Sequence, residues 1–329
     1  MARLPLTSRL SACLSIRCAL RGALRGATVL AGTFLLAACG APRQQAPGAG
    51  AKQAFQVVTT LLPISLFSRA VAGDCAVITP LISANSGPHD FQAKPGDLTA
   101  LRQARVLVKN GLEIENFLDK LVVAAGHPKL AVIDSSSAVR TLANDQHGEH
   151  HGHAHGAVNP HIWLDPLRAV QQVETIRDGL AKADPSCAEG YRRNAAAYIA
   201  QLKQLHREIS SQLKPYRGQT FVAFHDFAPY FAQRYGLQAT YLVDVPELNP
   251  SPADLQRVAA EVKRSQLKAL LSEPQEGNRS LNALAKDLGV KVVEFDPLET
   301  ASDAASRDPA TYFKVMRANV AGLRQAFSR

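Results

Sequence analysis

The 329 residues suffice for two compact lobes of about 100–150 residues each, and a content of 46% apolar and 20% charged residues is ordinary for a globular protein. The formal net charge of +9 would suit a nucleic-acid partner, but five of the 37 basic residues lie before Cys39, where no acidic residue occurs. The rest of the chain carries no basic stripe, which argues against a nucleic-acid-binding protein.

The N-terminus has the features of a lipoprotein export signal. An arginine-bearing segment precedes an uncharged apolar run at 27–38, which is too short to span a bilayer and ends in Leu36-Ala37-Ala38-Cys39. This tetrad resembles the lipobox of bacterial lipoproteins, whose cysteine is acylated. An ordinary secretory signal with an incidental cysteine is the alternative. We expect a signal peptide at 1–38, a lipid anchor at Cys39 and a flexible Pro- and Gly-rich tether at 39–52.

Two further cysteines remain once the expected signal and the anchor are set aside. These are Cys75 and Cys187, because Cys13 and Cys18 lie within the signal. An exported compartment permits a disulfide between Cys75 and Cys187. Sequence alone does not show whether their Cα atoms come close enough, so the bridge stays open at this point.

From Gln53 the chain alternates short apolar strands with amphipathic helices. Strands of β-branched residues that are separated by helices indicate a parallel sheet. In chain order, the expected elements of the first half are a strand at 55–61, a helix at 63–72, a strand at 77–82, a helix containing 98–103, a strand at 105–109, a helix around 115–125 and a strand at 130–134.

A single long helix is expected over 185–214. Asp184 precedes it as a cap, Pro185 takes its first position, and apolar residues recur at steps of three and four along one face. At 1.5 Å per residue this helix is a rod of roughly 45 Å, long enough to run along both lobes and hold them at a nearly constant angle.

The second half repeats the alternation of the first. Its expected elements are a strand at 220–224, a helix near 227–235, a strand at 239–243, a helix at 252–264, a strand at 268–272, a helix at 280–288, a strand at 291–295 and a helix at 309–326. The segment KPGDL at 94–98 is similar to SPADL at 251–255, and each follows the second strand of its half. An internal duplication is the simplest explanation.

The predicted fold class is therefore α/β, with two similar lobes joined by one long, rigid linking helix. Each lobe would contain a mostly parallel four-stranded sheet with flanking helices. The predicted domains are an N-terminal lobe at 53–183 with a histidine-rich loop at 146–156, the linking helix at 184–217 and a C-terminal lobe at 218–329.

Half of the ten histidines lie within nine residues of HGEHHGHAH, with only Gly, Glu and Ala between them. Such a segment has no apolar side chain to bury and is expected to be a solvated loop. Neutral imidazoles at this density bind Zn²⁺, Ni²⁺ or Cu²⁺ weakly, although a purely solubilising loop is the alternative. The candidate ligands of this weak secondary site are His147, His150, His151, His153 and His155.

Three other histidines stand near predicted strand ends or in a distinctive loop. His89 follows the second strand of the first half, His225 ends the first strand of the second half, and His161 lies in a proline-bracketed segment with the lone tryptophan. Asp296 follows the last strand of the second half. Ligands collect beyond the carboxyl ends of parallel strands, so two facing lobes would place these groups in one cleft.

The chain resembles the zinc-uptake (ZnuA-like) branch of the metal-binding solute-binding proteins of ABC transporters. The resemblance covers nearly the whole chain from Phe55 and rests on ordered segments: GPHDFQAKPGDL, VLVKNGLEIENFLDKL, the histidine-rich loop, NPHIWLDP, TFVAFHDFAPYFAQRYGL, SPADL, LLSEPQ and LGVKVVEFDPL. It implies a metal site of His89, His161, His225 and Asp296. In manganese importers of this type the third ligand is glutamate, whereas three nitrogens and one carboxylate suit tetrahedral Zn²⁺.

The resemblance implies that the protein is not an enzyme but captures Zn²⁺ and delivers it to an ABC-transporter permease, as a monomer anchored by its lipid on the periplasmic or cell-surface side of a membrane. The sequence lacks a GxxxxGK[ST] phosphate loop, so energy must come from another subunit. Alternatives are manganese or mixed-metal uptake, a zinc hydrolase with Glu273 or Asp226 as base, and a zinc-binding adhesin or storage lipoprotein.

Overall fold

The computed structural model describes residues 54–89, 91–142, 158–244, 249–274 and 279–328. The chain divides into two compact units, 1–51 and 52–329, and all described residues belong to the second. The predicted signal peptide, the Cys39 anchor, the tether and the histidine-rich loop lie outside the described residues. Among the helices in the described part, none is long and apolar enough to cross a membrane.

The first half folds as predicted around one parallel sheet. Its strands pair in the order β2-β1-β3-β4, in parallel throughout, with Val57 opposite both Ile78 and Val106. The elements are β1 (Phe55–Thr59), α1 (Leu62–Ala72), β2 (Ala76–Pro80), α2 (Pro95–Gln103), β3 (Val106–Lys109), α3 (Leu118–Ala125) and β4 (Ala131–Asp134).

The second half also contains four strands in parallel pairs. Its elements are β5 (Thr220–His225), α6 (Pro229–Tyr235), β6 (Gln238–Val243), α7 (Pro252–Ser265), β7 (Ala269–Ser272), α8 (Arg279–Leu288), β8 (Lys291–Glu294), α9 (Asp303–Arg307) and α10 (Thr311–Phe327).

The predicted second four-stranded sheet differs in one respect. Its strands form two pairs, β5-β6 and β7-β8; β5 lies beside β7, but no hydrogen-bonded ladder joins them within the described residues. At the carboxyl end of β5 the backbone N–H of His225 donates instead to the side chain of Glu273, just after β7, at 3.0 Å. The Glu273 carboxylate thus accepts a backbone N–H that would otherwise be available to a neighbouring strand. This bond lies at the carboxyl end of β5, where the candidate ligands also lie.

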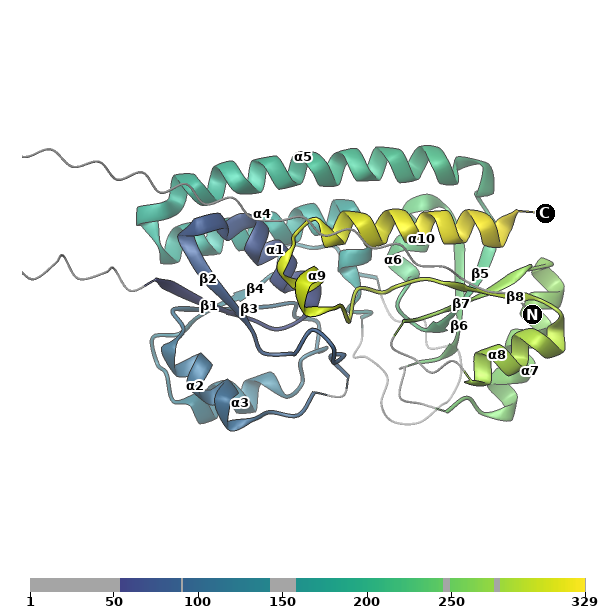
Figure 1. Ribbon diagram of the computed structural model, residues 1–329, viewed down its shortest axis with the longest axis horizontal. Helices are drawn as coiled ribbons and strands as arrows, with labels where there is room; N and C mark the ends of the chain where they lie inside the picture. The colour runs from purple at the N-terminus through teal and green to yellow at the C-terminus, as the bar shows by residue number, and fades with distance from the viewer. Residues whose placement is uncertain (1–53, 90, 143–157, 245–248, 275–278, 329) are drawn as a thin grey trace, which may run out of the picture. The chain divides into compact units, whose positions relative to one another are not determined.

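A helical layer connects the two halves (Figure 1). The long helix α5 (Ala188–Leu213) is preceded by a 3₁₀ turn at Pro185–Cys187 and packs on α1 and on α4 (Pro166–Ala183), and also on α6 and α10. One core cluster runs from Val57 of β1 through Leu202 of α5 to Leu323 of α10. The halves therefore share a core in addition to the smaller clusters beneath α2–α3 and α7–α8.

The repeated KPGDL and SPADL segments have the same local structure. Each begins a helix with proline at its first turn, and each aspartate accepts the N–H of the capping residue three positions earlier. The bonds are Lys94 N to Asp97 Oδ2 at 2.7 Å and Ser251 N to Asp254 Oδ2 at 2.9 Å. The same aspartate bond to the N–H of the capping residue in both segments supports the interpretation of the chain as a duplicated unit.

The disulfide that the sequence left open is formed. Cys75 and Cys187 are bonded, with Cα atoms 6.0 Å apart, and they join the turn before β2 to the start of α5. A side chain at Gly190 would come within 2.8 Å of the Cys75 sulfur, which explains the glycine there.

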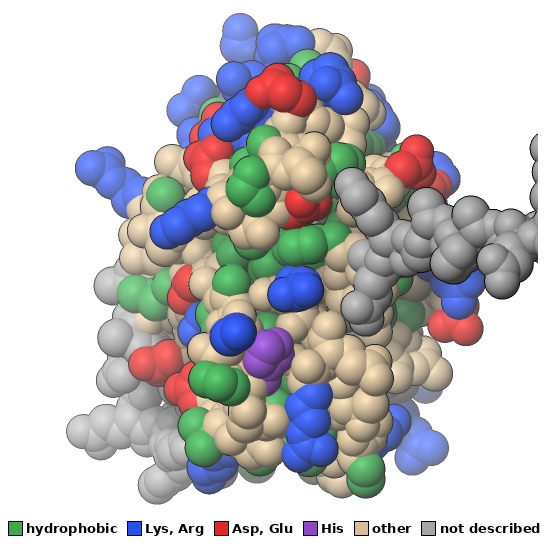
Figure 2. Space-filling model, turned by 90° about the vertical axis from the view of Figure 1, so that its left-hand side faces the viewer, with side chains coloured by type: hydrophobic (Ala, Val, Ile, Leu, Met, Phe, Trp, Pro, Cys, Tyr) green, Lys and Arg blue, Asp and Glu red, His purple; other side chains and the backbone are tan. Residues whose placement is uncertain are grey.

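The surface of the first half carries mixed charge on the face turned to the viewer in Figure 2. Lys and Arg side chains are interspersed with Asp and Glu side chains around a central band of apolar groups. This face shows no continuous stripe of positive or of negative charge.

Candidate metal site

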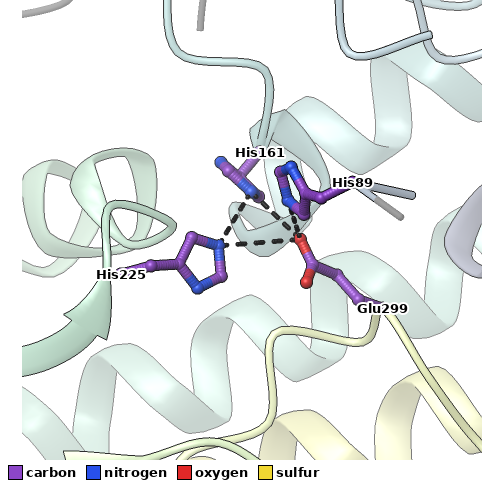
Figure 3. Close-up of side chains that lie close together, drawn as sticks. All are labelled: His89, His161, His225 and Glu299. Atoms are coloured by element: carbon purple, nitrogen blue, oxygen red, sulfur yellow. Dashed lines mark hydrogen bonds and ion pairs between the residues drawn. The ribbon is translucent and has the colours of Figure 1, made fainter. Parts of the chain in front are cut away.

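Four side chains that are distant in sequence meet in the second compact unit (Figure 3). His89 lies in the loop between β2 and α2, His161 precedes a 3₁₀ turn at Ile162–Leu164, His225 is the last residue of β5, and Glu299 lies in the loop after β8. One potential ligand atom from each lies within 4.8 Å of the others. The three predicted histidines are thus brought together.

The distances within this cluster suit a small tetrahedral ion. Glu299 Oε1 lies 3.2 Å from His89 Nε2, 3.2 Å from His161 Nε2 and 3.7 Å from His225 Nε2, and the last two nitrogens are 3.4 Å apart. Ligand atoms bonded at about 2.0–2.1 Å in a tetrahedron are roughly 3.3 Å apart. Four of the six distances among these atoms are therefore close to those of a tetrahedral zinc site, and all six are within 4.8 Å.

The site is almost closed to solvent. His161 and His225 are fully buried, Glu299 is 4% exposed, and the His89 side chain retains 9% exposure. Burial of polar groups is costly unless they are paired, so a cluster of this kind needs a partner for each nitrogen and oxygen. The Glu299 carboxylate and the three imidazoles supply these partners to one another.

Two of the histidines are oriented by partners on their far side. His161 Nδ1 faces Asn159 Oδ1 at 2.9 Å, and His225 Nδ1 faces the Glu273 carboxylate at 2.7 Å. Because these oxygens accept, each Nδ1 carries a hydrogen, and Nε2 is the ring nitrogen that faces the cluster in both histidines. Partners of this kind fix the tautomer and ring orientation of metal-binding histidines.

The charges in the cluster are strongly coupled. Burial lowers the pKa of His161 to about 4. Burial also acts to lower the pKa of His225, but the carboxylates of Glu273 and Glu299 outweigh it and raise that pKa well above its ordinary value. Burial would raise the pKa of Glu299, yet the surrounding imidazoles hold it well below its usual range.

Asp296, the fourth ligand expected from the sequence, is not part of this cluster. Its Oδ1 accepts the N–H of Leu298 at 2.7 Å, and its backbone is held at both N–H and C=O by the Asn319 side chain. The carboxylate is thus used to form a turn, and burial raises its pKa to about 7.

Glu299 occupies the place expected for Asp296. Leu298 has a left-handed backbone with φ of 64°, so the chain reverses just after Pro297 and directs the third residue beyond Asp296 into the cluster. The sequence offered both acids in one loop. The reversal at Leu298 and the bonds of Asn319 to the Asp296 backbone distinguish them, and a leucine gives no sequence signal for such a conformation.

Comparison with known proteins gives a consistent result. The family model "ZnuA: Zinc-uptake complex component A periplasmic" matches residues 57–326. The zinc-binding protein AdcA of Streptococcus pyogenes serotype M3 is 30% identical over 285 residues, which cover 82% of this chain and 55% of AdcA. The chain thus spans about half the length of this relative. The high-affinity zinc uptake system protein ZnuA of Bacillus subtilis is 27% identical over 309 residues, with 92% of this chain and 97% of that protein covered.

A solved structure shares the fold. The Zn(II)-bound ZnuA-like domain of Streptococcus pneumoniae AdcA matches with a TM-score of 0.71 and 29% sequence identity, over 84% of this chain and 100% of that one. The likeness extends over both halves of the described fold.

Proposed function

Because the chain belongs to the ZnuA family of periplasmic zinc-uptake components, we propose that it is a solute-binding protein that captures Zn²⁺ and delivers it to an ABC-type importer. The observation that carries this proposal is the buried cluster of three imidazole nitrogens and one carboxylate oxygen within 4.8 Å of one another. The proposed ligands are His89, His161, His225 and Glu299.

The donor set favours zinc over manganese. Imidazole nitrogens suit Zn²⁺, whereas Mn²⁺ prefers sites rich in carboxylate, carbonyl or water oxygens. At the third ligand position this chain has His225, which offers a nitrogen, and not a glutamate, which would offer an oxygen. The Nδ1 of His225 is hydrogen-bonded to Glu273, and this bond makes Nε2 a stronger electron-pair donor to a metal. The names of the relatives AdcA and ZnuA, which are given as zinc-binding and zinc-uptake proteins, agree with this choice.

Delivery requires partners outside this chain. We propose that a permease receives the ion, that a lipid on Cys39 anchors the protein on the periplasmic or cell-surface side of a membrane, and that the chain acts as a monomer. The name of a related protein, zinc-binding lipoprotein AdcA of Streptococcus pneumoniae, supports the anchor. The histidine-rich loop at 146–156 would hold zinc weakly before it reaches the buried site.

A zinc hydrolase is less well supported by the geometry. Glu273, which could be nominated as a general base, is 1% exposed and is engaged with both the N–H and the ring of His225. A base committed in this way orients a ligand and does not activate a water. Turnover of peptides or phosphoesters that a chelator abolishes would contradict this assignment.

The proposal is tested by zinc titration of the full chain in competition with a chelator. His225→Ala should abolish tight binding, whereas His127→Ala serves as a matched control, because His127 contacts the carbonyl of Ala104 outside the cluster. Unchanged zinc affinity in His225→Ala would contradict the assigned site. Deletion of 146–156 separates uptake from storage: one retained tight site supports uptake, and loss of all tight binding supports storage.

A further inference from the structure

The segment that carries His161 is held mainly by the second half, although it precedes the long linking helix in the sequence. Residues 159–165 are all buried. Three hydrogen bonds tie this segment to elements of the second half: Tyr230 Oη to Asn159 O at 2.7 Å, Trp163 Nε1 to Pro297 O at 2.8 Å and Tyr312 Oη to Trp163 O at 2.7 Å. Contacts from α6, α10 and the loop after β8 therefore hold this segment, together with one bond from the first half, Asn110 Nδ2 to Pro160 O at 3.1 Å.

The Asn159 side chain uses its whole amide in this arrangement. Its Oδ1 accepts the backbone N–H of His161 at 3.1 Å and the ring Nδ1–H of His161 at 2.9 Å. Its Nδ2 donates to two oxygens of Asp226, the backbone carbonyl at 2.8 Å and the carboxylate Oδ2 at 3.0 Å.

These four bonds leave the amide a single orientation. An amide nitrogen is a donor and an amide oxygen is an acceptor, so the group that faces the two Asp226 oxygens must be the nitrogen. The oxygen then necessarily faces His161, whose Nδ1 must carry the hydrogen. The lone pair of His161 Nε2 is thereby directed into the cluster, 3.2 Å from Glu299 Oε1.

We propose that Asn159 and Asp226 are positioning residues for zinc binding: Asp226 fixes the orientation of the Asn159 amide, and Asn159 fixes the tautomer and ring orientation of His161. This inference rests on the proposed function. Asp226 directly follows His225 in the chain, so one strand end supplies a ligand and also orients a second ligand from a distant segment. Glu273 orients His225 by direct contact, whereas the bonds of Asp226 to Asn159 connect it to His161 through the Asn159 amide.

The test is a double-mutant cycle on the Kd for Zn²⁺, measured on the full chain by chelator competition. Asn159→Ala should raise Kd about 10- to 100-fold, the range usual for loss of a partner of a metal-binding histidine. Asp226→Ala should raise Kd less, because the carbonyl of residue 226 remains. Since Asp226 acts through Asn159, the double variant should bind zinc no more weakly than Asn159→Ala alone. Asp226→Asn keeps an acceptor oxygen and should bind like the wild type.

A purely structural role would give a different pattern. Asn194→Ala is the control, since Asn194 donates to Val71 O outside the cluster and its loss should lower thermal stability without changing Kd. Additive effects of Asn159→Ala and Asp226→Ala, or an unchanged Kd in folded Asn159→Ala, would overturn the inference.

If Asn159→Ala does not fold, the comparison of Asp226→Ala with Asp226→Asn tests the inference. Weaker binding in Asp226→Ala with wild-type binding in Asp226→Asn supports the inference, and equal Kd in the two overturns it. A wild-type chain without a tight zinc site contradicts the proposed function itself. A tight site that is indifferent to these variants contradicts only the positioning roles.

Discussion

Replacement of Glu299 by glutamine should weaken zinc binding far more than replacement of Asp296 by asparagine. Both substitutions replace one carboxyl group of the same loop by an amide and nearly preserve side-chain shape. Only Glu299 presents its oxygen to the histidine nitrogens, at 3.2 to 3.7 Å, whereas the Asp296 carboxylate accepts the Leu298 N–H within its own turn.

The expected magnitude follows from charge and distance. A doubly charged ion about 2 Å from a carboxylate oxygen gains roughly 17 kcal/mol of Coulomb energy at an effective dielectric constant of about 20, most of it offset by the desolvation of ion and carboxylate. If about a fifth of this Coulomb energy remains as a net gain, near 3 kcal/mol, Glu299→Gln raises the Kd for zinc more than 100-fold. Asp296→Asn should change Kd only a few-fold.

The assay is chelator-competition titration of both variants beside the wild type, with thermal unfolding to show that each is folded. Comparable losses would mean that the loop rearranges when the ion binds. A larger loss in Asp296→Asn would refute the reasoning, because it would make Asp296 the ligand and Glu299 its replaceable neighbour.

Three further outcomes are expected. His225→Glu, which converts the site to two nitrogens and two carboxylates, should lower zinc affinity and raise manganese affinity; a preference unchanged in competition between the two ions would contradict the role of this ligand. Glu273 and Glu299 raise the pKa of His225 well above its ordinary value despite burial, so zinc is expected to displace a proton from this ring. Zinc affinity should therefore rise with pH through neutrality. Calorimetry in buffers of different ionisation enthalpy should detect the released proton. A pH-independent affinity would count against this. Reduction of the Cys75–Cys187 bond, whose cysteines are 112 residues apart, should lower the free energy of unfolding by about 4–5 kcal/mol in urea titrations, yet leave zinc affinity unchanged.

The alternation of apolar strands and amphipathic helices was sufficient to predict the strands. All eight lie within one or two residues of the expected ranges, because each is a short, largely apolar run between helices, and most contain β-branched residues. The first four-stranded parallel sheet and the long helix α5 are confirmed. Helix α4 was not predicted, although the sequence contains two signals for its start. The Asp165 side chain accepts the N–H of Leu167 as an N-cap, and Pro166 is the first helical residue.

The candidate site was likewise predicted only in part. The sequence placed His89, His161 and His225 together because two of them follow strands and the third lies in a recognisable motif, and the structure gathers all three. Asp296 was expected as the fourth ligand and Glu299 was missed, since the conformation of their loop depends on a left-handed leucine and on hydrogen bonds to Asn319, which is 23 residues from Asp296 in the chain. Long-range contacts of this kind leave no local pattern.

The most direct test of the central claim is anomalous scattering at the zinc absorption edge from crystals of the zinc-loaded chain. The account predicts one strong, fully occupied peak with His89, His161 and His225 bound through Nε2 and Glu299 through its carboxylate. A peak ligated by Asp296, or zinc bound only outside this cluster, would contradict it.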